Sequence, residues 1–424
     1  MADQPHFAIV GGSIWGNRGA EAMLLTTIAQ IRAYAPNAVF KVYTIYPDRD
    51  RLLVSEENIH FLSGKPLAFG LLYFPFALLH NLLSFLGISF PLPSSLKKMK
   101  DSFCLLDMGG ITFSDGRTPQ LLYNVFSIWP ALLLGVPVIK LSQAMGPFER
   151  GLNRHLANHF LPKCKMVFAR GAITEDHLRG LNLPKGSYRR AADIAFLYQP
   201  TDSLSVENQE RVTRILTKLE EIQESGRRVI SIIPSSLVFQ QSKSGEGAYG
   251  SKLLNIIREV SPEKAHVVVL PNASRAGSGK VMNNDLTAID ALRERAAAEL
   301  PPEVVSQVTW VDFDINARSI RALVGKTDAL VTSRFHGMVA GLALCVPTMV
   351  IGWSHKYRET LADFNMAGYA INYEAGLKET LALFRDFWKN NAQIRGLLEG
   401  KIGAVQASAS LQFEYLREDI RHGS

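Results

Sequence analysis

Short apolar runs alternate with longer amphipathic segments along most of the chain. Residues 7–10 form an apolar run that leads into Gly11 and Gly12. In the next segment, residues 20–34, apolar side chains recur at the three- and four-residue spacing of a helix. A second apolar run follows at residues 40–45. The pattern therefore predicts a strand, a glycine-rich loop, a helix and a strand in succession.

The same alternation recurs downstream. Further strands are predicted at residues 103–108, 136–142, 166–169, 228–233, 266–270, 308–311, 329–332 and 348–351. Further helices are predicted at residues 207–225, 249–260 and 285–300. Strands that alternate with helices build mostly parallel sheets that helices cover on both faces, so the chain is predicted to be an α/β protein.

A polar segment at residues 199–205 interrupts the alternation, and we interpret it as a linker. A chain of 424 residues is too long for one ordinary core and suits two or three domains. The predicted domains are residues 1–200 and residues 201–424, the second ending in helices. Two such halves are expected to face each other across a cleft, with ligands bound outside the carboxyl ends of the strands.

Residues 67–93 do not fit this alternation, because they are almost wholly apolar and approach the length of a membrane span. Prolines and polar residues interrupt them, and parts of one α/β domain are predicted on both sides, which argues against a span. Two interpretations remain open. One is a helical hairpin in a single leaflet, with Lys97, Lys98 and Lys100 on anionic head groups. The other is an apolar insertion on the core or at a dimer interface.

The composition narrows the class of partner. Forty-six Lys and Arg against 39 Asp and Glu give a formal charge of +7, which suits an anionic partner. Basic residues are not interleaved with aromatic ones as in proteins that follow a nucleic-acid backbone, so nucleic acid is not expected. Three cysteines without metal or disulfide spacing fit a reducing compartment. The N-terminus lacks the features of a signal peptide, so we expect a cytoplasmic protein, with peripheral membrane contact through residues 67–93 left open.

The most informative motif is SRFHG at residues 333–337. The predicted strand at residues 329–332 ends just before it, and a helix rich in small residues is predicted to begin near Gly337. Backbone N–H groups and the helix dipole at such a turn attract anions. Arg334 adds a planar fork for carboxylate or phosphate, and His336 is placed to transfer a proton near neutral pH. A purely structural hydrogen bond of His336 is the weaker alternative, because Arg, His and Gly share one turn.

A second arginine, Arg170, ends the predicted strand at residues 166–169. It either binds an anion or pairs at the surface with Glu175 or Asp176. If the two halves close, Arg170 and Arg334 would flank one polyanion.

The N-terminal half carries glycine turns and acidic residues. Gly11, Gly16 and Gly19 allow close backbone approach to a ligand or positive φ, although neither a GxGxxG motif at Gly11 nor a Walker motif is present. Glu21 lies in the first helical turn, where a carboxylate complements the dipole. Asp115 is equally a base, a hydroxyl ligand or a turn former.

Together these residues resemble the polysaccharide pyruvyl transferase family. The matching segments are GNRGAEAM (16–23), DMGGITFSD (107–115), QAMGP (143–147), FARGAITEDHL (168–178), ADIAF (192–196), Asn284-Asp285, and SRFHGMVAGLALCVP (333–347) followed by Lys356. They spread over most of the chain, and the SRFHG block is the most specific of them.

The resemblance implies a fold similar to the GT-B glycosyltransferases, with two Rossmann-like domains facing across a cleft, the acceptor on the N-terminal side and the donor on the C-terminal side. It implies phosphoenolpyruvate as donor substrate and a sugar hydroxyl pair as acceptor, on a cell-surface polysaccharide or its lipid-linked precursor. No metal or other cofactor is expected.

The resemblance also implies roles for single residues. Arg170 and Arg334 would bind the donor carboxylate and phosphate, and His336 would be the general acid or base. Asp115, the second catalytic candidate, and Glu21 would lie towards the acceptor. The remaining substrate-binding candidates are Ser333, Gly337, Gly16, Asn17, Gly19, Gly109, Gly110, Gln143 and Lys356.

Three positions depart from the family pattern. Ile111 replaces the third glycine of a triplet, Ala144 replaces another glycine, and Asn272 stands where a histidine is common. These changes concern the acceptor more than the donor. Two other functions stay open: a GT-B-type glycosyltransferase that uses a nucleotide sugar, and a non-catalytic component of polysaccharide assembly.

Overall fold

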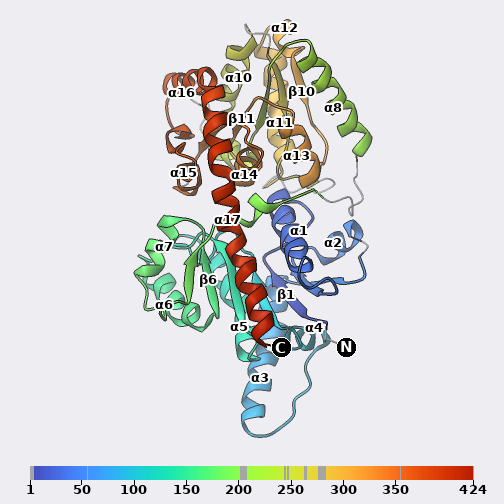
Figure 1. The fold of residues 1–424 in the computed structure, drawn as a ribbon, viewed down its shortest axis with the longest axis vertical. Coiled ribbons are helices and arrows are strands. Elements are labelled where there is room, and N and C mark those ends of the chain that lie inside the picture. The colour runs from blue at the N-terminus through green and yellow to red at the C-terminus, as the bar shows by residue number, and fades with distance from the viewer. Residues whose placement is uncertain are drawn as a thin grey trace. The chain divides into compact units, whose positions relative to one another are not determined.

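The computed structural model describes residues 4–54, 56–200, 208–242, 245, 248–261, 265–275, 283–353 and 355–423. The chain divides into two compact units (Figure 1). Unit 1 comprises Met1–Trp15, Ala20–Gln199 and Gln406–Ser424, and unit 2 comprises Gly16–Gly19 and Pro200–Val405. Each unit is built on one parallel sheet, which confirms the α/β class. The cleft expected between the two halves stays a prediction.

Unit 1 contains a seven-stranded parallel sheet in the order β3-β2-β1-β4-β5-β6-β7. The strands are β1 His6–Val10, β2 Val39–Thr44, β3 Ile59–Ser63, β4 Cys104–Asp107, β5 Val138–Gln143, β6 Met166–Ala169 and β7 Tyr188–Arg190. The central strands are buried on both faces, which explains why they read as continuous apolar runs. The strand order reverses between β1 and β4.

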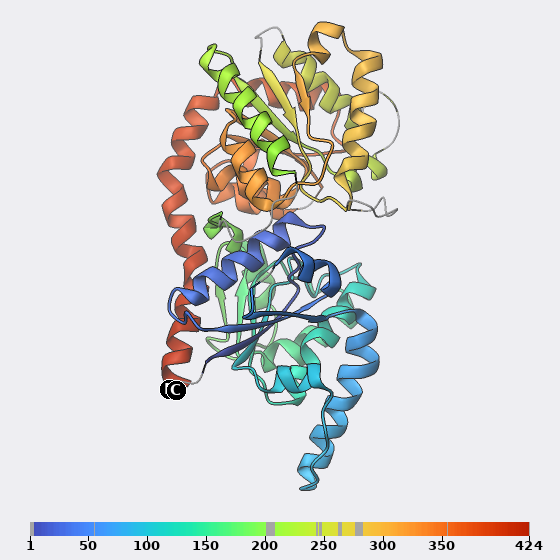
Figure 2. The same cartoon turned by 90° about the vertical axis from the view of Figure 1, so that its right-hand side faces the viewer.

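Helices cover both faces of this sheet. They are α1 Arg18–Arg32, α2 Pro47–Leu53, α3 Phe74–Phe85, α4 Ser94–Lys100, α5 Thr118–Leu133, α6 Gly151–Phe160 and α7 Ala172–Arg179. One face, with Ala8, Leu105 and Val167, shares a core with residues of α3 to α6. The other face meets the end of α17, Asn391–Gly423, where Phe168 packs edge-on against Tyr415 (Figure 2).

Two segments of the chain belong to a different unit from the one in which the sequence placed them. The structure divides between Gln199 and Pro200, residues 406–424 group with unit 1, and Gly16–Gly19 group with unit 2. Gln412 explains the first difference, since it accepts the Ser142 N–H at 2.6 Å and donates to the Ala192 carbonyl at 3.1 Å. The apolar periodicity of a helix does not say which surface the helix will cover.

Unit 2 contains a six-stranded parallel sheet in the order β10-β9-β8-β11-β12-β13. The strands are β8 Val229–Ile233, β9 His266–Val269, β10 Val308–Trp310, β11 Ala329–Thr332, β12 Thr348–Gly352 and β13 Ala370–Asn372. The helices are α8 Gln209–Glu224, α9 Ser236–Gln241, α10 Tyr249–Val260, α11 Asp285–Glu299, α12 Pro302–Val305, α13 Ala317–Gly325, α14 Phe335–Ala343, α15 His355–Ala362, α16 Leu377–Lys389 and the first part of α17. The strand order reverses between β8 and β11. Most of the predicted linker, from residue 201 on, lies outside the described residues.

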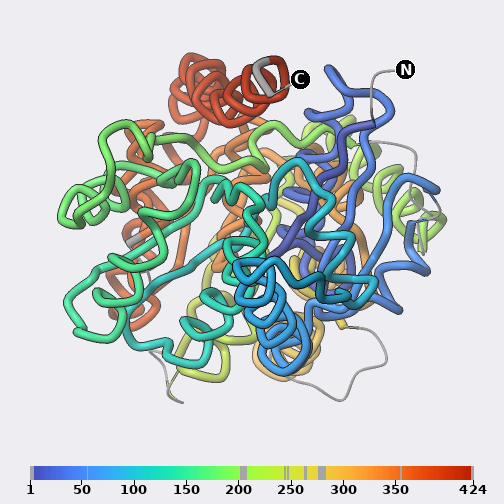
Figure 3. Tube along the Cα trace, turned by 90° about the horizontal axis from the view of Figure 1, so that it is seen from below, coloured from blue at the N-terminus to red at the C-terminus, as the bar shows by residue number. Residues whose placement is uncertain are grey.

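Residues 67–93 do not form the predicted helical hairpin. A π-helical turn, Ala68–Tyr73, continues into α3, and the chain then returns without regular structure to α4 (Figures 1 and 3). The helix ends at Phe85; Gly87, just past its C-cap, has φ +74°, and the Ile88 N–H bonds back to the Leu83 carbonyl at 2.9 Å. The prolines that follow disfavour a second helix.

Residues Ala68–Phe85 are the one helical segment among the described residues that is long and apolar enough to cross a membrane, judged by length and composition. However, β3 precedes this segment, β4 follows it, and both strands belong to the same sheet. The two ends of the segment therefore lie on the same side of any bilayer, and it does not cross one.

Candidate active site

Arg334 and His336 stand at a strand-to-helix turn of unit 2. Strand β11 ends at Thr332, as predicted, and α14 begins at Phe335, two residues before the predicted start. Arg334 caps the helix with an extended backbone, φ −108° and ψ 128°, so His336 is the second residue of the helix. The first backbone N–H groups of a helix have no partners within it, which makes this turn a site for an anion.

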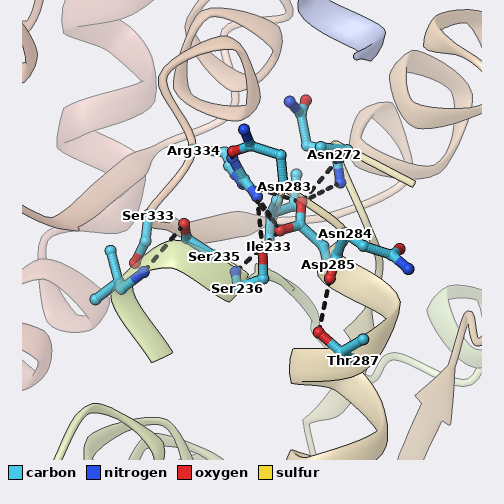
Figure 4. Close-up of polar contacts among 12 residues, drawn as sticks. Ile233, Ser235, Ser236, Asn272, Asn283, Asn284, Asp285, Thr287, Ser333 and Arg334 are labelled. Carbon is cyan, nitrogen blue, oxygen red and sulfur yellow. Dashed lines mark hydrogen bonds and ion pairs between the residues drawn. The ribbon is translucent and has the colours of Figure 1, made fainter. Parts of the chain in front are cut away.

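A buried carboxylate orients Arg334. Its Nε lies 3.0 Å from both carboxylate oxygens of Asp285, and its Nη2 donates to Asp285 Oδ1 and, at 3.2 Å, to Ser236 Oγ (Figure 4). Asp285 is fully buried, whereas the Arg334 side chain is 15% exposed. Asp285 also accepts the backbone N–H groups of Ser236, Asn272 and Ala273 at 2.8–3.2 Å. The carboxylate thus joins the loops after β8 and β9 to the guanidinium of Arg334.

These contacts lie at the topological switch point of the sheet. Ser236 follows β8, Asn272 follows β9 and Arg334 follows β11, and the strand order reverses between β8 and β11. Open parallel sheets bind ligands at this crevice. Within the described residues, Nη1 of Arg334 has only a 3.5 Å contact, to Asn283 Oδ1. One edge of the fixed guanidinium therefore remains available to an anionic ligand.

Ser333 and Gly337 shape the turn. The buried Ser333 hydroxyl accepts a bond of 2.6 Å from the Tyr249 hydroxyl. Burial raises the pKa of Tyr249, so this phenol stays protonated and donates. A Cβ on Gly337 would lie 2.8 Å from Thr332 Oγ1, so glycine allows α14 to pack close to the strand. The predicted substrate contacts of Ser333 and Gly337 stay predictions.

The segment Gly16–Gly19 lies against His336 within unit 2. A Cβ on Gly19 would lie 2.1 Å from both Cγ and Nδ1 of the imidazole, a distance that excludes every side chain. Gly16 has φ +81°, which favours glycine, and Asn17 Oδ1 accepts the Gly19 N–H at 3.1 Å. The structure thus brings Gly19 of the N-terminal glycine loop against the predicted acid–base residue His336.

Lys356 adds a positive charge near the same turn. It belongs to α15, and its Nζ lies 5.1 Å from the ring centre of Phe335, 5.3 Å from that of Tyr357 and 5.8 Å from that of Trp353. Cations are stabilised over aromatic rings at such distances. The lysine is therefore held beside the residue that precedes His336.

Arg170 of unit 1 is also oriented by an aspartate. It follows β6, and its Nη1 donates to Asp193 Oδ2 at 2.8 Å, with side chains only 5% and 1% exposed. Asp193 Oδ1 in turn accepts the Ala195 N–H at 2.9 Å. The alternative of a surface pair between Arg170 and Glu175 or Asp176 is wrong, because the arginine is buried.

Gln143 and Gly109 lie in a buried network at the ends of β4 and β5. Gln143 is fully buried, donates to the Asp107 carbonyl and accepts from Thr112 Oγ1, both at 2.6 Å. Asp107 accepts the Gly109 N–H at 2.9 Å and pairs with the fully buried Lys140. Both the oxygen and the nitrogen of the Gln143 side-chain amide are thus engaged within the protein. Its predicted substrate contact stays a prediction.

The remaining candidates also belong to unit 1. Asp115 accepts the backbone N–H groups of Glu149 at 2.9 Å and Arg150 at 3.1 Å, just before α6. These bonds fix the loop before α6, an anchoring role that leaves a role as a base untested. Gly110 faces open space at its Cβ position, and Glu21 is fully buried in the first turn of α1.

The structure brings together the candidates of unit 2, but Arg170, Asp115, Glu21, Gly109, Gly110 and Gln143 belong to unit 1. The idea that Arg170 and Arg334 bind one anion therefore stays a prediction. Sequence reasoning missed Asp285 and Asp193 as partners of the two arginines. Both lie in segments that carried the resemblance, each at the start of a helical turn, which was the available signal. Among the described residues no three His, Cys, Asp or Glu side chains form a metal site.

Solved structures of GT-B enzymes are similar to the whole chain. UDP-GlcNAc 2-epimerase from Neisseria meningitidis, bound to UDP-GlcNAc, is 12% identical, with a TM-score of 0.55 over 97% of this chain and 100% of that one. The S. aureus MnaA–UDP structure is 10% identical, with a TM-score of 0.57 over 93% and 91% of the two chains. Medicago truncatula UGT71G1, complexed with UDP-glucose, is 12% identical, with a TM-score of 0.55 over 99% and 100%. At these identities the likeness shows the fold alone.

The sequence comparisons address the family. No curated protein matches the sequence. The family model of polysaccharide pyruvyl transferase matches residues 17–355, a range that includes Gly19, Arg170, Asp285, Arg334 and His336. Enzymes of this family take a pyruvyl group from phosphoenolpyruvate and have polysaccharide acceptors. The chain belongs to the polysaccharide pyruvyl transferase family.

Proposed function

We propose that this enzyme transfers the pyruvyl group of phosphoenolpyruvate to a pair of sugar hydroxyls, and so forms a pyruvate ketal on a cell-surface polysaccharide or its lipid-linked precursor. One observation carries the proposal: Arg334 is fixed by Asp285 at the switch point, two residues before His336. Family membership supplies the donor in general terms, and this geometry supports its place in unit 2.

The donor is a compact anion with roughly two to three negative charges, so several fixed donors are needed to hold it. Asp285 neutralises much of the charge on Arg334, so the arginine serves mainly as an oriented hydrogen-bond donor through Nη1. The N-terminus of α14 and the Lys356 ammonium add positive potential at the same turn.

The reaction needs proton transfers close to this anion. One acceptor hydroxyl adds to C2 of the donor and loses its proton, while C3 gains a proton and becomes a methyl group. Phosphate then leaves C2, and the second hydroxyl closes the cyclic ketal with loss of its proton. His336 is the side chain at this turn that can give and take protons near neutral pH, so we assign it as the general acid or base.

The experiment measures phosphate release from phosphoenolpyruvate by the purified protein with a panel of soluble and polyprenyl-linked sugar acceptors. Release should depend on an acceptor, and His336→Ala should lower turnover by ~10²–10⁴-fold while the fold is unchanged. Arg334→Ala should weaken donor binding measured by calorimetry, whereas Arg293→Ala, an exposed arginine of unit 2, serves as the matched control. Near wild-type turnover of His336→Ala would refute its assignment.

A nucleotide-sugar glycosyltransferase remains the second candidate. The switch-point crevice with a helix N-terminus would hold a diphosphate equally well, because fold does not fix function. Calorimetry separates the two: phosphoenolpyruvate binding without binding of UDP-sugars supports the pyruvyl transferase. UDP-sugar binding without donor binding supports the alternative. Donor binding without release on any acceptor would favour the non-catalytic role.

A further inference from the structure

Helix α3 is apolar on two opposite faces, and only one of them is covered. On the covered face Ala77 of α3 is buried in the core of unit 1, together with Phe69 and Tyr73 of the preceding π-helical turn, and the ring centres of Phe74 and of Trp129 in α5 lie 4.3 Å apart. Only 17% of the segment Ala68–Phe85 is buried overall. Figures 1 and 2 show α3, in light blue, projecting from the rest of unit 1. The helix is therefore longer than the part of it that packs in the core of unit 1.

The uncovered face carries a continuous apolar stripe. Within α3, Leu78, Leu82 and Phe85 are all exposed and follow one another at intervals of four and three residues. At about 100° per residue these intervals place them on one side of the helix. Phe85, at the tip, is 90% exposed. A helix on a water-facing surface normally has polar residues here, so this stripe marks an interaction surface.

Exposed apolar residues continue past the helix. Leu86 is 66% exposed and Ile88 is 50% exposed, directly after the tip residue Phe85. The stripe and these two residues together form what we name the apolar tip surface: Leu78, Leu82, Phe85, Leu86 and Ile88. Its most exposed side chains lie where the chain turns back.

The charges around this surface have one sign. Residues 58–100 contain no Asp or Glu but four lysines, Lys65, Lys97, Lys98 and Lys100. The Lys100 Nζ lies 2.9 Å from Nε2 of His80, which ties the lysine of α4 to the middle of α3. A second copy of this chain would bring the same lysines against each other, which disfavours a symmetric dimer through this surface. An anionic surface is the complementary partner.

We propose that the apolar tip surface inserts into one leaflet of a bilayer that contains anionic lipids, with the α4 lysines Lys97, Lys98 and Lys100 on the head groups. From His80, at the level of Lys100, to Phe85 is five residues, or about 7.5 Å of helix. This length matches the ~5–10 Å depth to which interfacial helices enter the head-group and acyl boundary. The proposal concerns attachment and does not depend on the reaction.

Vesicle flotation tests the proposal with the full-length protein. It should float with vesicles that contain phosphatidylglycerol and bind more weakly to pure phosphatidylcholine. Replacing Phe85, Leu86 and Ile88 together with Ser should lower the partition coefficient by about a hundredfold on both vesicles. Lys97→Gln with Lys100→Gln should lower it by about fivefold per lysine, on the anionic vesicles only.

Matched variants separate this surface from general effects. Leu52→Ser with Leu152→Ser removes two leucines of unit 1 that are exposed but lie outside the apolar tip surface. Lys185→Gln removes an exposed lysine outside α4. Neither variant should change flotation. Circular dichroism and the melting temperature check that each variant folds. Absence of flotation on anionic vesicles would overturn the proposal. So would a dimer in light scattering that the triple Ser variant abolishes while flotation is unchanged.

Discussion

The two units use the same arrangement in two different places. In each, an arginine directly or nearly follows a strand, Arg170 after β6 and Arg334 after β11, and is held by an aspartate at the start of a helical turn, Asp193 or Asp285. Arg170 lies next to the edge of its sheet, whereas Arg334 lies at the switch point. Arg334 is also three times as exposed, 15% against 5%. The two arginines thus differ in their position in the sheet, and the switch point favours Arg334 as the proposed anion-binding one.

The two switch points differ as well. In unit 1 the loops after β1 and β4 meet backbone to backbone: a Cβ on Gly11 would lie 2.6 Å from the Gly109 nitrogen. Beneath these loops, the side chains of Lys140 and Asp107 form a buried ion pair. In unit 2 the corresponding crevice carries the partly exposed Arg334. Unit 2 is therefore the better place for a small anion.

Removal of the two aspartates should give the largest effect. Asp285→Ala leaves the largely buried Arg334 without that carboxylate, and Asp193→Ala does the same to the buried Arg170, so both should lower the free energy of unfolding by about 3–5 kcal/mol. Asp285→Ala should in addition release the Arg334 guanidinium at the proposed donor site, and a misplaced binding group costs about 10²-fold in kcat/KM. Urea unfolding and steady-state kinetics measure the two effects. An equal fall in kcat/KM for Asp193→Ala would break the comparison.

Acid should weaken unit 2 through His266 in β9. Burial, with Lys218 and Arg227 adding to it, lowers the pKa of His266 to about 4. The unfolded chain, with a histidine pKa of about 6.5, binds a proton that the folded chain does not. The free energy of unfolding should therefore fall by about 3 kcal/mol as pH drops from ~6.5 to ~4.

The variant His266→Gln tests this pH dependence. Glutamine has no titrating group in this range and keeps a polar atom for Thr309 Oγ1, which lies 2.8 Å from His266 Nε2. Urea unfolding across this pH range should show a shallower loss of stability in the variant than in the parent. Identical slopes would show that other groups cause the acid sensitivity. This measurement extends the comparison from the two arginine–aspartate pairs to the stability of the sheet that surrounds one of them.

The smallest expected effect concerns the close approach of Gly19 to His336. Gly19→Ala should cost about 1–3 kcal/mol of stability, because the new methyl group would overlap the imidazole. In a His336→Ala background the same change should cost much less, so the double-mutant cycle reports a coupling. Gly396→Ala, in α17, meets nothing within 4 Å and is the control. Equal costs in both backgrounds would contradict the contact.

Much of the fold is readable from the sequence because buried parallel strands are continuous apolar runs. The limits of β6 and β11 and of α10 agree with their predicted residues. Residues 67–93 show the limit of this reasoning: their composition predicts an apolar excursion, but the turn at Gly87 and the prolines after it decide between one helix and two. The predicted site was limited in the same way, since the motif identified Arg334 and His336 but neither aspartate.

The sequence by itself determined the α/β class, the strand-to-helix turn that carries Arg334 and His336, and the family, because periodicity and motifs are local properties. Only the tertiary structure decided that Asp285, 49 positions away, holds Arg334, that Gly19 lies against His336, and that residues 406–424 group with unit 1. These contacts depend on the order of the strands in each sheet, because that order decides which loops at the strand ends lie side by side. The physical reason is that the partner of a charged residue, or of a glycine that allows close packing, is distant in the sequence. The two come into contact only when the sheets have formed.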